Sequence, residues 1–475
     1  MNPTQTSTTI KLLSPTLHLY HYVLRNSLNE RPETTDKRRQ FFQENLQNLS
    51  THLTSSTNKR ASDFVQLIPI EQELAPSGNV LDFTTVPPEC QKPNNDRLYL
   101  ETGIIHSRLV ARRLNDTYLL RFTSYVPSIH QEQALPIFAN LGEHIANLPL
   151  ELGQTVILGG ILPNSYYSPS DIPQIAANCL SQYYGTQINP NNLRVEEFLN
   201  SPFCIYAQPV TIQKFNNYAI ESIHLSCVFL YQDPTIEQQA DKVYRIFQDM
   251  LLSYHKIHFF HSQSIILKKI LSQQYEAIER LTEDYNQQKW DSQSLKKLPQ
   301  DSLDYYKKLS FLQDQSKTVG VNLKNYQECL RQIQQQTGQT PPQFFTEFEQ
   351  EISFYREQME ANIGFLSPGI QLYEKLMLSV QTQVSIDEAA HQNQQNQQQA
   401  KLGQILAGVG AAIGVGQIIE APITATVSHR LDKGKPEPSI ASSWLGASLS
   451  VLLSIGIGYC ISLAVYRWFT QSKVS

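Results

Sequence analysis

Two long apolar stretches near the carboxyl end limit most strongly what this chain can fold into. Residues 402–428 carry one charge, Glu420, and residues 439–466 carry none. About 20 apolar residues in a helix are enough to cross the ~30 Å hydrocarbon core of a bilayer. The second stretch also has Trp444 near one end and Trp468 near the other, as membrane interfaces favour. The pattern predicts transmembrane helices at 402–428 and 442–468, a loop at 429–441 and a tail at 469–475.

The first stretch is the less apolar of the two, because glycine and alanine contribute little to insertion and Gln404 and Gln417 oppose it. A buried helix of a soluble domain is therefore the alternative for this segment. A second apolar stretch follows at hairpin distance, which favours the membrane interpretation.

Small residues recur at four-residue spacing in both stretches, which places them in one column along a helix. In lipid, small residues let helices approach closely, so this column predicts packing within the hairpin or between copies in a homo-oligomer. Glu420 continues the column, where it either lines a cation pathway or reaches water at the far interface. The predicted packing positions are Gly408, Gly410, Gly414, Gly416, Gly446, Ser450, Ser454, Gly458 and Ser462.

Residues 1–235 alternate strand-like and helix-like patterns and predict an α/β or α+β domain with a mixed sheet. Strands are expected at 64–70, 107–113, 117–126, 155–162, 203–212 and 222–231, where β-branched and aromatic residues concentrate. The Asn115-Asp116 pair predicts a hairpin turn between the second and third. Helices are expected at about 36–53, 131–148 and 171–185. The two glycines of "ILGG" (157–160) indicate a bend or bulge more than a phosphate loop.

After Pro234 the apolar residues follow helical spacing, with steps of three and four that predict a long-helix bundle or stalk over 236–401. Residues 370–402 contain neither proline nor glycine. This segment is therefore expected to form one helix that continues into the first apolar stretch.

Composition excludes some functions. The formal net charge is −5, which argues against a basic nucleic-acid-binding protein. The six cysteines form no CxxC pair, so a zinc site or a disulfide framework is not expected. The amino-terminal segment has no secretory pattern, so the large amino-terminal part is expected to be cytoplasmic.

No familiar catalytic or nucleotide-binding motif occurs, so neither an enzymatic activity nor a cofactor is predicted. One histidine cluster, His255, His258 and His261, has the spacing of one helical flank. It is a weak metal-binding candidate, since no carboxylate or cysteine lies nearby in sequence, and a solvated flank is the favoured alternative.

The order of a cytoplasmic α/β domain, long helices and two carboxyl-terminal spans resembles that of CorA-type divalent-cation transporters. The resemblance covers residues from about 236 onward, including "VQTQVSIDEAAHQNQQ" before the first span. It implies a pentamer whose first span lines a pore. The family's Gly-Met-Asn signature is absent, and "QIIEAPITA" stands in its place.

Together these features predict a multi-pass protein of the inner or plasma membrane, with a cytoplasmic regulatory domain coupled by a helical stalk to an oligomeric two-span module. Cation channel or transporter is the leading candidate activity, and the lipid bilayer and further copies are the expected partners. The ligand of the amino-terminal domain is unknown. A membrane-anchored scaffold without conduction is the alternative, and an enzyme with its site in 60–235 comes third.

Overall fold

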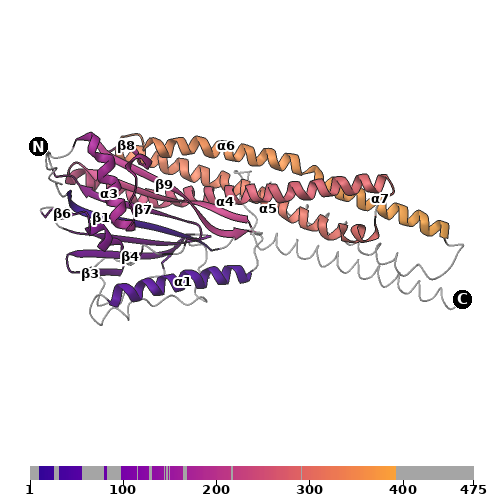
Figure 1. Ribbon diagram of the computed structural model, residues 1–475, viewed down its shortest axis with the longest axis horizontal. Coiled ribbons are helices and arrows are strands. Elements are labelled where there is room, and N and C mark those ends of the chain that lie inside the picture. Colours follow the sequence, from indigo (N-terminus) through magenta and orange to yellow (C-terminus); the bar gives the residue numbers. More distant parts are fainter. Residues whose placement is uncertain are drawn as a thin grey trace, which may run out of the picture. The chain divides into compact units, whose positions relative to one another are not determined.

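The computed structural model describes residues 10–391 except 26–31, 56–79, 83–97 and short gaps at 115, 128–130, 144, 146–147, 149, 164–167, 216–217 and 290. Residues 1–380 form one compact unit and 381–475 a second, of which only 381–391 are described. A mixed sheet is followed by long helices (Figure 1), which confirms the amino-terminal part of the predicted fold class.

The strands are β1 (Lys11–Leu24), β2 (Val80–Asp82), β3 (Leu98–Thr102), β4 (Ile105–Leu114), β5 (Thr117–Tyr125), β6 (Gln133–Ala134), β7 (Gly153–Ile161), β8 (Arg194–Phe198), β9 (Ser201–Phe215) and β10 (Tyr218–Tyr231). The helices are α1 (Pro32–Ser55), α2 (Ile137–Gly142), α3 (Ile172–Tyr184), α4 (Pro234–Asn286), α5 (Ser292–Thr337), α6 (Gln343–Leu366) and α7 (Pro368–His391).

The sheet runs in the order β2-β4-β5-β1-β7-β10-β9-β8, with β3 paired to β4 and β6 paired to β1. β7 and β10 are parallel, and the other described pairs are antiparallel. β1 therefore occupies the middle of the sheet, hydrogen-bonded to β5 on one side and β7 on the other.

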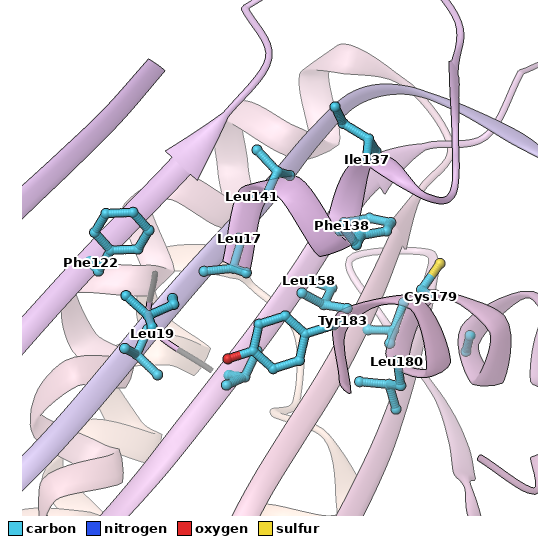
Figure 2. Close-up of a cluster of buried hydrophobic side chains, with 14 of the residues drawn as sticks. Leu17, Leu19, Phe122, Ile137, Phe138, Leu141, Leu158, Cys179, Leu180 and Tyr183 are labelled. Atoms are coloured by element: carbon cyan, nitrogen blue, oxygen red, sulfur yellow. The ribbon is translucent and has the colours of Figure 1, made fainter. Parts of the chain in front are cut away.

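Alternation along the central strands gives the sheet two different faces. On one face, Leu17 and Leu19 of β1 meet Leu158 of β7 under α2 and α3 (Figure 2). Cys179 of α3 lies in this cluster as a free, buried thiol. The opposite face, with Tyr20 of β1, is covered by α4.

The glycines of β7 permit close packing, and the strand itself is regular. A Cβ atom at Gly159 would lie 2.8 Å from the Tyr231 hydroxyl and closer still to that of Thr16. The register shift lies in β1, between Leu13 and Thr16, directly beside these glycines. The predicted irregularity therefore belongs to the neighbouring strand, where Pro15 lacks the N–H that a regular ladder needs.

The long helices begin at well-capped residues. The Asp233 carboxylate accepts the N–H groups of Thr235 and Ile236, and Pro234 occupies the first turn of α4. α5 packs along α4, and α6 packs against both. The predicted boundary at residue 235 falls at the start of α4.

Several predicted elements differ from the structure. The expected helix at 131–148 is wrong in extent, because among the described residues of this range only 137–142 are α-helical, after Pro136, and a short strand precedes them. The expected strand at 64–70 and the last part of the helix predicted over 370–402 lie outside the described residues. β1 was not predicted at all.

The predicted membrane protein is contradicted. No helix among the described residues is long and apolar enough to cross a bilayer. The reason is their composition, because α4 to α7 carry charged and amide side chains throughout their length. The segments predicted as spans, 402–428 and 442–468, lie outside the described residues. The prediction of a membrane channel, transporter or anchored scaffold, with its multi-pass localisation, is therefore corrected.

Candidate functional site

A polar cavity of about 570 Å³ lies where the first turns of α4 meet the sheet. Its sheet side comes from β1, β4 and β5, and its helix side from α4. The described lining residues are Ser14, Thr16, His18, Tyr20, Arg108, Arg121, Thr123, Tyr125, Pro127, Glu237, Gln238, Asp241, Tyr244 and Arg245. Three arginines and two carboxylates are among them, which gives these walls an excess of one positive charge.

Strand register brings the sheet-side groups together. His18 of β1 lies opposite Thr123 of β5, which in turn lies opposite Arg108 of β4. The next row with the same orientation joins Tyr20 to Arg121. Alternate residues of a strand share a face, so these side chains all point away from the core in Figure 2. The result is a polar floor built from three neighbouring strands.

Ser14 forms one wall through an unusual backbone conformation. Its φ is +48°, in the left-handed region, and it sits within the register shift of β1. Its hydroxyl donates a hydrogen bond of 2.9 Å to Oε1 of Glu237 on α4. Bulges and left-handed residues other than glycine cost free energy and concentrate at binding sites.

α4 supplies two carboxylates one helical turn apart. Burial raises the pKa of Glu237, partly offset by the hydrogen bond from Ser14, and the nearby Asp241 raises it further. Burial also raises the pKa of Asp241, while the positive charge of Arg108 acts to lower it. Arg108 and Asp241 thus interact electrostatically from opposite sides of the cavity.

His18 is a buried, uncharged member of the site. Its Nδ1 lies 3.2 Å from the Thr123 hydroxyl, and its ring packs 4.2 Å from that of Tyr244. Burial lowers the pKa of His18 to about 3, and the charges of Arg121 and Arg108 act in the same direction. At neutral pH this imidazole is therefore neutral, and the positive charge of the floor comes from the arginines.

Hydrogen bonds from the sheet fix α4 beside the cavity. Tyr20 donates its hydroxyl to the carbonyl oxygen of Tyr244 at 3.0 Å, and Tyr22 donates to that of Gln248 at 2.6 Å. The guanidinium of Arg121 also donates to Oε1 of Gln248, at 3.2 Å. These contacts hold the helix-side groups at a set position over the arginines.

The predicted histidine cluster lies elsewhere on α4. The rings of His255 and His258 both contact Tyr254, and each of the three histidines also has a further partner of its own. His255 Nε2 pairs with the Thr155 hydroxyl at 2.7 Å, whereas His258 stacks on Phe348 and His261 on Tyr355. His255 is buried and His258 and His261 are half-buried, so the expected solvated flank is not what the structure has. No group of three or more potential metal ligands occurs among the described residues.

Glu420 and all the small-residue positions in 402–428 and 442–468 lie outside the described residues.

Sequence reasoning did not find the cavity, because its residues come from two ranges, 14–127 and 237–245. One signal was available in "HSRLVARR", where Arg108 and Arg112 alternate with the buried Leu109 and Ala111. That spacing puts both arginines on one face of a strand whose other face is apolar. The pattern marks a charged sheet face but not the helix that lies across it.

No protein-family model matches the chain. No curated protein is significantly similar to it in sequence. The resemblance to CorA-type transporters therefore stays an untested prediction.

Proposed function

We propose that the sheet and the first turns of α4 form a binding site for a small organic anion. The observation that carries this proposal is a cavity of about 570 Å³ with Arg108 and Arg121 on adjacent strands of its floor. Small-molecule sites in proteins commonly have volumes of about 300–1,000 Å³.

Guanidinium groups suit this role because their planar forks match carboxylate and phosphate oxygens. The hydroxyl group of Thr123 lies on the same wall and can donate to a further oxygen of the ligand, whereas that of Thr16 is buried against Gly159. His18 adds a neutral ring, so it neither attracts nor repels the anion strongly.

The backbone conformation of Ser14 supports a binding role over a purely structural one. A left-handed serine costs free energy, and a regular β1 would avoid that cost. The register shift instead places the Ser14 hydroxyl against Glu237 at the cavity wall. Such a local cost is expected where a strand is shaped for a ligand.

The test is isothermal titration calorimetry of the full chain with acetate, succinate, citrate and inorganic phosphate at low ionic strength. The variant Arg108→Leu is expected to weaken binding of the best anion by about tenfold or more, since a hydrogen-bonded charge contributes about 1.5–3 kcal/mol. Arg121→Leu is expected to act in the same way.

Arg280→Leu is the matched control, because Arg280 is an exposed arginine of α4 outside the cavity. It should leave the affinity unchanged. Circular dichroism melting of each variant separates lost binding from lost folding. The proposal is wrong if no anion binds, or if Arg280→Leu weakens binding as much as the cavity variants do.

A further inference from the structure

The cavity has two walls of opposite charge. Arg108 and Arg121 lie on the sheet, whereas Glu237 and Asp241 lie on α4 together with Arg245, so the formal charge is positive on the sheet wall and negative on the helix wall. A ligand with only an anionic group would pair with the arginines of the sheet but would also bring negative charge close to two carboxylates. The occupant that fits both walls carries a positive group as well.

From this arrangement, which rests on the proposed anion site, we infer that the ligand is a zwitterion of the amino-acid class. Its carboxylate binds Arg108 and Arg121, and its ammonium group binds Glu237 and Asp241. The ligand spans the cavity from the strands to the helix.

The carboxylate pair gives the strongest reason for an ammonium group. Glu237 and Asp241 are four residues apart on one helix, a spacing at which like charges repel. Glu237 is half-buried and Asp241 is exposed at the cavity, and the protein around each carboxyl raises its pKa by desolvation. A hydroxyl group would offer a hydrogen bond but no charge, whereas an ammonium group offers three donors and a positive charge between them.

The interaction between Arg108 and Asp241 gives the second reason. The charge of Arg108 stabilises the ionised form of Asp241 across the cavity. A zwitterion that lies between these two residues places its carboxylate at Arg108 and its ammonium group at Asp241. Both protein charges keep an opposite charge beside them when such a ligand binds.

Matched pairs of ligands test this inference directly. The full chain is titrated calorimetrically with the ω-amino acids from glycine to 6-aminohexanoate, each compared with the alkanoate of the same length. The twenty standard L-amino acids are screened in parallel by thermal shift, with glutarate as the partner of glutamate and propionate as that of alanine. At least one amino acid is expected to bind about tenfold or more tightly than its ammonium-free partner.

Two isosteric variants then test whether the carboxylates of α4 cause the tighter binding of amino acids. Glu237→Gln and Asp241→Asn remove a charge while keeping the size of the side chain. Each is expected to weaken binding of the best amino acid about tenfold while changing the affinity of the matching carboxylate less than about threefold. Glu276→Gln, at an exposed glutamate of the same helix, is the control and should change neither.

The outcomes distinguish the two proposals. If carboxylates bind as tightly as the amino acids, or the preference survives in both isosteric variants, the zwitterion inference is overturned and the anion site remains. If neither class of ligand binds, both proposals fail. Comparable melting temperatures for the variants and the native chain exclude misfolding as the cause.

Discussion

The side chain of Glu196 on β8 accepts the backbone N–H of Phe344 in the first turn of α6. The nitrogen lies 2.9 Å from one carboxylate oxygen and 3.2 Å from the other. Pro342, the residue before α6, has no side chain that could cap it. A carboxylate from a neighbouring strand thus takes the place of a local capping residue.

Replacing this carboxylate should weaken the packing of α6 against β8. Glu196→Ala is expected to lower the free energy of unfolding by about 1–2 kcal/mol, the usual loss for a helix cap. Urea denaturation measures the change. Glu197→Ala, at the exposed next residue of β8, is the control and should cost less than about 0.5 kcal/mol. Equal losses in the two variants would count against the capping role.

The close packing at Gly159 makes a second prediction. Gly159→Ala should destabilise the chain by about 1–3 kcal/mol, because the new methyl group would meet the hydroxyls of Tyr231 and Thr16. Gly364→Ala is the comparison, since Gly364 lies in α6 with nothing within 4 Å of the added Cβ. That change should stabilise the helix by up to about 1 kcal/mol. A tolerated alanine at Gly159 would show that β1 and β10 can move apart there.

Buried histidines make stability depend on pH. Burial lowers the pKa of His18 and His258 to about 3 and of His21, His224 and His261 to about 4, and that of His255 well below its usual value. The unfolded chain binds these protons near pH 6.5 and the folded chain does not. Stability is therefore full above about pH 6.5 and falls as the pH drops toward 4, by about 1.4 kcal/mol per pH unit for each such histidine.

One variant isolates this effect from other titrating groups. The raised pKa values of Glu237, Asp241 and Asp249 act in the opposite direction as the carboxyls take up protons. His258→Phe keeps a ring against Phe348 and removes one titrating group. Urea midpoints between pH 8 and 4 should fall less steeply in this variant. An unchanged slope would show that His258 does not contribute.

The ion pair between Lys256 of α4 and Asp116 of the β4–β5 turn supports a fourth prediction. The Lys256 side chain is 8% exposed and that of Asp116 37%. Asp116→Asn should cost about 1–3 kcal/mol, because it leaves a buried ammonium group without its counter-charge. Lys256→Met should cost less, since the methionine stem fills the same space. Urea denaturation of both single variants and the double variant gives the coupling energy. Strict additivity would mean that the pair contributes nothing to stability.

The elements that sequence could predict are those with one dominant period. β4 and β5 were expected from their strand-like composition around Asn115-Asp116, and α3 from the helical pattern at 171–185. β1 was missed because Pro15 and His18 interrupt its apolar run, although Pro15 lies within the register shift and His18 faces the cavity. α4 to α7 were expected only as a long-helix bundle or stalk over 236–401, because steps of three and four do not specify where each helix ends.

The cavity could not be predicted because its parts come together only through tertiary packing. Arg121 and Asp241 are far apart in the sequence, and neither lies in a recognisable motif. Their proximity depends on α4 crossing the sheet over β1, which no local pattern specifies. The spacing of the α4 histidines indicated a common flank, but tertiary packing places His255 against Thr155, His258 against Phe348 and His261 against Tyr355.

The charged residues that contact the start of α6 also lie at the edge of the sheet. β8 is the outermost strand of its side of the described sheet, and unpaired outer strands invite pairing with another molecule. Arg194 and Glu196 of β8 bind each other, and Arg194 also binds Glu347 of α6. Charged side chains engaged in this way make the strand a poor template for a second chain, so the same contacts that anchor the helix also protect the sheet from aggregation.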